Sequence, residues 1–265
     1  MKSSTKKPFI TGKKIRQHIL DLSFRAHEGH IGSALSVSDI VAVMYGEILH
    51  IPNVRSQNRD RFILSKGHAA LALYCALQLK GLMRKQTFET YGSDGSLLGV
   101  HPETALSGIE FSTGSLGQGL SFGVGTALAA RIKNKSYHTY VLVSDAECNE
   151  GSVWEAVMFA AHHRLSNLTV IVDLNGQQAF GYTRDVLGLG RLSEKFKMFG
   201  WNAYDVGGHD KRKLSATLRR KTSKPKAIIA HTTFGKGVSF MEHQIKWHYQ
   251  TLSEQEYSVA VKNLK

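Results

Sequence analysis

The chain has 265 residues, with 34 Lys and Arg residues against 21 Asp and Glu residues and a formal net charge of +13. No Pro/Ser-rich linker or internal repeat divides it, so we predict a basic N-terminal tail over residues 1–14 and a single α/β domain over residues 15–265. The two cysteines exclude a disulfide framework. We find neither a signal peptide nor a run of about 20 apolar residues, and we expect a cytoplasmic protein that does not enter a membrane.

The positive charge is compatible with nucleic-acid binding, but its distribution argues against that function. The basic residues fall into separate groups, mainly residues 2–14 and 211–226, without interleaved aromatic side chains on which bases could stack. A basic surface, an acidic partner subunit or phosphorylated substrates explain the charge equally well. We therefore expect no nucleic-acid partner.

Apolar residues recur at helical spacing from Ile15 to Ala26, and Gly29 is a stop signal for this first helix. Further helices are predicted over residues 36–49, 68–79, 114–131, 151–165, 193–199, 211–219 and 254–261. Strands are predicted over residues 141–143, 169–172, 202–206 and 227–231, with a strand or turn over 61–64. Residues 91–108 and 176–190 are predicted as loops beside the ligand. The alternation predicts a doubly wound parallel sheet flanked by helices.

Two polar residues follow strands of this predicted sheet. Asp145 ends one apolar strand, and Asn175 ends another 30 positions later. Ligands of an open parallel sheet lie at the carboxyl ends of its strands, so we expect both side chains at one place. A carboxylate and an amide oxygen suit Mg²⁺ or Ca²⁺, and Mg²⁺ usually completes its shell with phosphate oxygens and waters. An isolated Asp and Asn more often merely end their strands, so the neighbouring motifs decide whether this pair forms a metal site.

These motifs resemble those of transketolases. Asp145, Glu150, Gly151 and Asn175 are similar to the thiamine-diphosphate motif, in which an acid and a glycine follow GDG and an Asn comes about thirty residues later. The segments RFILSKGHAALALY (61–74), GVHPE (99–103) and TGSLGQGLSFGVGTALA (113–129) also resemble the family. The likeness is to the separate N-terminal subunit of split transketolases. It implies the pyrophosphate-binding domain of the thiamine-diphosphate fold.

The resemblance implies roles for individual residues. Asp145, Asn175 and the Gln177 carbonyl would hold Mg²⁺ (or Ca²⁺). His30 and His101 would bind donor hydroxyls and move protons, which suits imidazole near neutral pH. The implied contacts to thiamine diphosphate come from His68, Gly114, Leu116, Asp145, Ala146, Glu150 and Asn175.

Two assignments stay open at this point. A late histidine of the family corresponds to either His243 or His248. Glu150 belongs, in relatives, to a carboxylate network that links two cofactor sites across a dimer. It is equally an acid favoured by the positive end of the dipole of the following helix.

The chain departs from the family pattern at three positions. Ser144 and Ala146 replace the two glycines of GDG, and Ser115 stands where the family usually has proline. If the site required a positive φ at Ala146, the alanine would carry strain of about 1 kcal/mol. These changes put cofactor affinity in question and suggest a divergent branch of the family.

The resemblance also implies a partner. The glutamate that activates thiamine lies in a pyrimidine-binding domain, which this sequence does not contain. We expect a heterotetramer with a separate C-terminal, pyrimidine-binding subunit. It would transfer a two-carbon ketol unit from a ketose or ketose phosphate to an aldose. The alternatives are a specialised ketol or acyl transfer in sugar or secondary-metabolite synthesis, and a non-catalytic scaffold.

Overall fold

The structure is a computed structural model and describes residues 10–264. Within these residues a parallel five-stranded sheet has the order β1–β2–β3–β7–β6. Its strands are β1 (Arg61–Leu64), β2 (Thr139–Ser144), β3 (Leu168–Leu174), β7 (Lys226–His231) and β6 (Asn202–Gly207). The predicted doubly wound fold is therefore confirmed, and β2 and β3, which precede Asp145 and Asn175, are neighbours.

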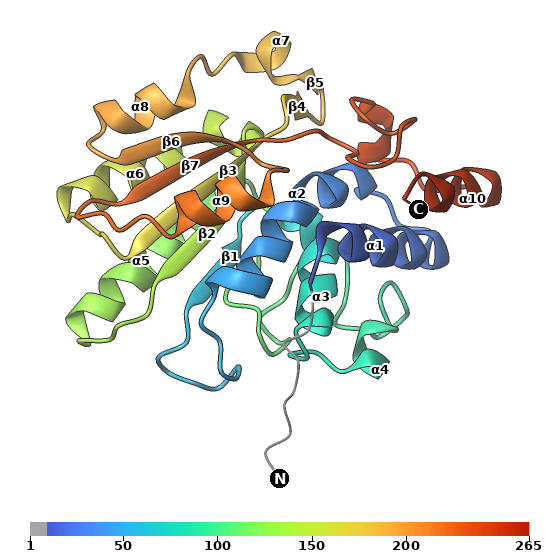
Figure 1. Cartoon of the computed structure of the whole chain (residues 1–265), viewed down its shortest axis with the longest axis horizontal. Helices are drawn as coiled ribbons and strands as arrows, with labels where there is room; N and C mark the ends of the chain where they lie inside the picture. The colour runs from blue at the N-terminus through green and yellow to red at the C-terminus, as the bar shows by residue number, and fades with distance from the viewer. Residues whose placement is uncertain (1–9, 265) are drawn as a thin grey trace.

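Helices cover both faces of the sheet (Figure 1). The core on one face includes residues of α1 (Gly12–Ala26), α2 (Ile31–Val43), α3 (Ala70–Leu79), α9 (Lys211–Leu218) and α10 (Glu254–Asn263), and α10 packs against α1. The other face packs against α5 (Gln118–Ile132), α6 (Gly151–His162) and α8 (Leu192–Met198). Successive strand residues alternate between the two cores, since Leu142 lies in the first and Val141 and Val143 in the second. The central strands β2 and β3 are buried on both faces, which is why most of their residues are apolar.

The first helix differs from its prediction at both ends. α1 begins at Gly12 because Thr11 Oγ1 accepts the Lys14 N–H at 3.2 Å, so the predicted tail over 1–14 is wrong at its last three residues. Residues 1–9 of that tail lie outside the described residues. The helix ends at His27, whose left-handed φ of 52° takes the capping role expected of Gly29.

The second helix is apolar on all sides. Together with the π-helical turn η1 (Met44–Ile48), α2 forms an 18-residue segment, Ile31–Ile48, that is long and apolar enough to cross a membrane by length and composition. The expectation that no such run exists is thus wrong. However, 78% of the segment is buried within the protein, where α2 packs against α1 and α3. A helix enclosed by its neighbours has this composition without any membrane.

One of the two predicted loops is more ordered than expected. Residues 176–190 hold a short hairpin, β4 (Gln177–Gln178) and β5 (Gly181–Tyr182), and the turn of helix α7 (Thr183–Leu187). Residues 91–108 contain turns and bends but neither helix nor strand, as predicted. The remaining short elements are α4 (Lys85–Phe88) and the 3-10 turns η2 (Gly67–Ala69), η3 (Ala146–Asn149) and η4 (Ile245–His248).

Candidate active site

A cavity of about 220 Å³ lies at the carboxyl edge of the sheet, where β1, β2 and β3 end. It collects segments that are far apart in the sequence. The predicted site residues that line it are His30, His68, His101, Gly114, Leu116, Ala146, Asn175 and Gln177. The structure therefore brings most of the predicted site together at one place. Asp145 lies beneath the cavity wall, fully buried.

Four of the described histidines surround the cavity. The ring centroid of His30 lies 5.8 Å from that of His68, 6.3 Å from that of His101 and 5.0 Å from that of His248. His30 is held in place at a left-handed φ of 60°, where its N–H donates to the His248 carbonyl at 3.2 Å. His248 lines the cavity. His243 does not line it, and its backbone carbonyl accepts a hydrogen bond from Gln177 Nε2 at 2.8 Å. The choice left open by the sequence thus falls on His248.

Three of these imidazoles, those of His30, His68 and His248, have lowered pKa values. Burial lowers the pKa of His30, with a smaller contribution from His101. Burial, followed by the charge of Lys66, lowers the pKa of His68 well below its usual value. Burial lowers the pKa of His248 to about 4, and His30 and Lys66 add to this effect. Neutral imidazoles at pH 7 can each accept one hydrogen bond and donate another, as binding and proton transfer to sugar hydroxyls require.

A buried ion pair supports the floor of the cavity. Lys66 Nζ lies 2.6 Å from Asp173 Oδ2, and both side chains are almost fully enclosed. Asp173 also accepts from the hydroxyls of Ser36 at 2.8 Å and Thr232 at 2.5 Å, and from Asn175 Nδ2 at 2.9 Å. This network fixes the Asn175 amide, whose Oδ1 accepts the Gln177 N–H at 2.9 Å. The pair was missed by sequence reasoning, although a lysine in SKGH and an acid inside an apolar strand are both visible signals.

Asp145 is oriented by backbone and side-chain donors. Its Oδ1 accepts the Ala146 N–H at 3.0 Å, and its Oδ2 accepts the Gly176 N–H and the Thr183 hydroxyl, each at 2.9 Å. Burial, and then the nearby Asp173, raises the pKa of Asp145 to about 6. A bound cation would relieve this cost of enclosing the carboxylate.

The donor set fits a divalent cation that is shared with a phosphorylated ligand. Asp145, Asn175 and the Gln177 main chain supply hard oxygen donors, and Gln177 Oε1 is buried without a hydrogen-bond partner among the described residues. Residues 10–264 contain no cluster of three or more His, Cys, Asp or Glu side chains that could hold a metal ion alone. A Mg²⁺ ion here would thus need ligand oxygens to complete its shell, which is its usual mode of binding.

A second buried carboxylate, which sequence reasoning also missed, joins the cavity walls. Glu147 Oε1 accepts from the Ser65 hydroxyl at 2.5 Å and from the Gly117 N–H at 3.0 Å. Its Oε2 accepts the Ser144 N–H at 2.9 Å. Glu147 therefore joins the end of β1 and the glycine loop, the segment over residues 113–117 that leads into α5, to the end of β2. Glu150 instead lies exposed at the start of α6 and does not line the cavity, although its side chain lies against Gly117, next to the predicted contact Leu116.

The replaced glycine of the motif carries no strain. Ala146 begins the turn η3 and is not among the described residues with a positive φ. Its N–H is held by Asp145, and the Ser144 hydroxyl accepts the Glu147 N–H at 3.1 Å. The alternative in which alanine costs about 1 kcal/mol is thus excluded.

The glycine loop is shaped by close contacts. α5 begins at Gln118, later than the predicted start at Gly114, because Gly117 has a left-handed φ of 81°. A Cβ on Gly119 would come within 2.5 Å of Ser65 Cβ, and a Cβ on Gly67 within 2.5 Å of the Thr113 carbonyl oxygen. Only glycine lets these segments meet beside the cavity.

The chain as a whole matches a known family. The family described as "Transketolase, thiamine diphosphate binding domain" matches residues 10–264. The chain belongs to the transketolase family. The resemblance in its motifs is thus confirmed, and the family description names the predicted cofactor, thiamine diphosphate.

Individual transketolases agree with this assignment. The chain is similar to an apulose-4-phosphate transketolase subunit of Phocaeicola vulgatus, with 37% identity over 260 residues that cover 96% of this chain and 92% of the relative. The 6-deoxy-6-sulfo-D-fructose transketolase subunit SqwG of a Clostridium species is 36% identical over 257 residues, which cover 95% and 94% of the two chains.

The fold agrees with solved transketolases as well. The structure matches transketolase from Campylobacter jejuni with a TM-score of 0.89 at 28% identity, and the match covers 98% of this chain. It matches the transketolase from Leishmania mexicana with a TM-score of 0.88, also at 28% identity. The chain spans only 43% and 40% of these two solved chains, but nearly all of the two relatives that are named as subunits.

Proposed function

We propose that this transketolase-family chain is the pyrophosphate-binding subunit of a two-subunit, Mg²⁺-dependent transketolase. The observation that carries the proposal is the cavity itself, which four histidines line together with Asn175 and Gln177, the oxygen donors that follow β3. The reaction moves a two-carbon ketol unit from a ketose or ketose phosphate to an aldose. When bound, thiamine diphosphate supplies the nucleophilic carbanion and the electron sink of this reaction.

The residues of the chain divide the remaining work. Asp145, Asn175 and the Gln177 carbonyl hold Mg²⁺ together with the diphosphate oxygens. His30 and His101 bind the hydroxyls of the donor sugar and accept or return their protons. His68 and His248, whose rings lie 5.2 Å apart, complete the polar wall. The depressed pKa values of His68 and His248 keep these two rings neutral at pH 7, so each can accept one hydrogen bond and donate another.

A second subunit completes the site in this proposal. The cavity of about 220 Å³ is smaller than the ~300–1,000 Å³ usual for sites that enclose a small molecule, so the chain provides one wall of the site. Apolar side chains on α5 and α6 are unusually exposed, with Phe122 at 41%, Met158 at 50% and Phe159 at 44%. They suit a C-terminal, pyrimidine-binding subunit in an α2β2 assembly, and the two relatives above are also named as subunits.

The proposed location is the cytoplasm. Cys75 and Cys148 are both buried as free thiols, which suits a reducing compartment. Sugar or sugar-phosphate substrates act there as donors and acceptors. The names of the two relatives point to ketoses that carry a phosphate or sulfonate group.

Calorimetric titration with thiamine diphosphate and Mg²⁺ tests the proposal. We expect tight binding only when the chain is mixed with its partner subunit, and loss of that binding in Asp145→Ala. Release of glycolaldehyde units from a panel of ketoses and ketose phosphates then identifies the donor. Absence of cofactor binding both with and without the partner would favour the scaffold alternative instead.

A further inference from the structure

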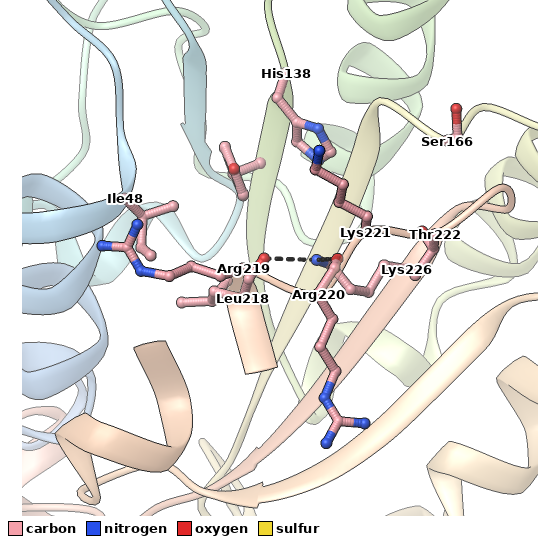
Figure 2. Close-up of a pocket in the computed structure, with 10 residues that line it drawn as sticks. Ile48, His138, Ser166, Leu218, Arg219, Arg220, Lys221, Thr222 and Lys226 are labelled. Carbon is pink, nitrogen blue, oxygen red and sulfur yellow. Dashed lines mark hydrogen bonds between the residues drawn. The ribbon is translucent and has the colours of Figure 1, made fainter. Parts of the chain in front are cut away.

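A second cavity, of about 510 Å³, lies at the opposite edge of the sheet (Figure 2). Its walls come from the start of β2, the start of β3 and the connection between α9 and β7. β2 follows His138, which lines this cavity, and ends at Ser144 in the candidate active site. At about 3.3 Å per residue, the two cavities lie roughly 20 Å apart, so one small ligand cannot fill both.

Basic side chains dominate the polar part of this cavity. They are Arg219, Arg220, Lys221 and Lys226, whereas burial, and then the charge of Lys226, lowers the pKa of the lining His138 to about 3 and leaves its ring neutral. None of the described lining residues is acidic, and the nearby Asp60 has its Oδ1 occupied by the His138 N–H at 2.8 Å. Such a concentration of positive charge in a concave site favours an anionic ligand.

The basic side chains differ in their availability. In the described part of the chain, no hydrogen bond or ion pair involves the ammonium of Lys221, and Figure 2 shows this side chain extending toward the His138 ring. Arg220, by contrast, points away from His138 and lies over the Tyr204 ring at 4.9 Å. Arg219 lines the rim of the cavity, and one edge of its guanidinium is occupied because its Nη2 donates to the Glu47 carbonyl at 2.9 Å. Lys221 is therefore the cation that is freest to bind a ligand.

Lys226 is a buried cation aimed at the same space. It is only 3% exposed, and its Nζ donates to the Leu218 carbonyl at 2.6 Å and to the Arg220 carbonyl at 2.8 Å (Figure 2). These two hydrogen bonds cap the end of α9 and use two of the three N–H groups of the Lys226 ammonium. Burial, and then the charge of Arg220, lowers the pKa of Lys226 to about 8. A bound anion would stabilise the buried ammonium and raise this pKa.

The rest of the lining is apolar. Ile48, Leu218 and the ring of Tyr140 form a hydrophobic wall beside the cations. A volume of about 510 Å³ lies within the ~300–1,000 Å³ usual for small-molecule sites, and it exceeds the space that a single phosphate needs. The combination suits a molecule with one anionic group and a ring or hydrocarbon part, rather than a polymer on a flat surface.

We propose that this cavity is a binding site for a small organic phosphomonoester, distinct from the thiamine site. The phosphate would bind Lys221, Lys226 and the guanidinium of Arg219 at the rim of the cavity. The organic part would lie against Tyr140 and Leu218. The proposal does not depend on the transketolase activity, because none of these residues lines the active-site cavity.

Phenyl phosphate is a suitable probe, and thiamine diphosphate with Mg²⁺ and the partner subunit should be present at saturation to occupy the other site. We expect calorimetry to give one equivalent of binding and NMR to show a shift of the His138 ring signals, assigned with His138→Gln. Lys221→Gln should weaken binding at least about tenfold, as expected for loss of a charge-assisted hydrogen bond. Lys224→Gln is the matched control, since this exposed lysine does not line the cavity, and it should change affinity less than about twofold.

Three outcomes would overturn the proposal. No binding at millimolar phenyl phosphate would exclude the site. Equal weakening by Lys221→Gln and Lys224→Gln, with no shift at His138, would show attraction to surface charge alone. Equal affinity for inorganic phosphate and phenyl phosphate would exclude an organic ester as the preferred ligand.

Discussion

Lys66 and Asp173 form a buried ion pair, with 2.6 Å between Lys66 Nζ and Asp173 Oδ2, directly behind the amide of Asn175. Their side chains are 1% and 0% exposed. Two charges without water require mutual pairing and further hydrogen bonds, and Asp173 obtains these from Ser36 and Thr232. The pair therefore holds the Asn175 side chain in one orientation beside the cavity.

Lys66→Met should destabilise the protein by about 3–5 kcal/mol, because it leaves the Asp173 carboxylate buried without its cation. Urea unfolding followed by circular dichroism measures the loss. The double variant Lys66→Met/Asp173→Asn removes both charges and should recover part of the stability. A single variant that unfolds within about 1 kcal/mol of the native chain would contradict the assigned role of the pair.

Glu147 and Glu150 offer a matched comparison within one motif. Glu147→Gln replaces an acceptor of three hydrogen bonds with an amide whose NH₂ group faces a donor, so we expect a loss of about 1–3 kcal/mol. Glu150→Gln changes an exposed side chain and should stay within about 0.5 kcal/mol of the native chain. Thermal unfolding of the isolated chain separates the two, and similar losses in both variants would argue against the buried role of Glu147.

The fold could be predicted from the sequence because local pattern and topology agree. Apolar runs such as 169–172 and the helices between them admit few arrangements other than a parallel sheet with covered faces. The boundaries were less accurate, since caps decide them. Thr11 starts α1 before the apolar repeat, and His27 ends it with a left-handed conformation that is more typical of glycine.

The candidate site was predictable where a residue belongs to a motif. His30 and His68 each follow a glycine, His101 lies two residues after Gly99, and all three histidines line the cavity. Glu147 and Asp173 were missed because their roles depend on partners far away in sequence, which no local pattern reveals. The choice between His243 and His248 likewise required the path of the chain after β7.

His248 should titrate with a pKa near 4 in the isolated chain, well below that of an unfolded histidine near 6.5. Between pH 4 and pH 6.5, His248 is therefore protonated in the unfolded chain and neutral in the folded chain. The stability contributed by neutral His248 is therefore complete above about pH 6.5 and is lost as the pH falls toward 4. NMR titration of the ring protons, assigned with His248→Gln, measures the pKa. The variant should also lose less stability than the native chain between pH 7 and 5.

Two glycines of α5 should respond to alanine in opposite directions. A Cβ on Gly119 would lie 2.5 Å from Ser65 Cβ and 2.8 Å from Ser65 Cα, so Gly119→Ala must push the glycine loop away from the end of β1 at a cost of about 1–3 kcal/mol. Nothing lies within 4 Å of a Cβ on Gly125, where alanine should stabilise the helix by up to about 1 kcal/mol. Denaturant unfolding measures both variants.

The same two alanine variants distinguish an effect on stability from an effect on cofactor binding. Gly119→Ala also displaces the segment that Glu147 fastens through Gly117, so thiamine diphosphate should bind more weakly to its complex with the partner subunit. Gly125 lies on an exposed part of α5, away from the cavity, and its variant should bind the cofactor with native affinity if the partner still assembles. Native cofactor affinity in Gly119→Ala would mean that the close contact between α5 and β1 serves stability alone.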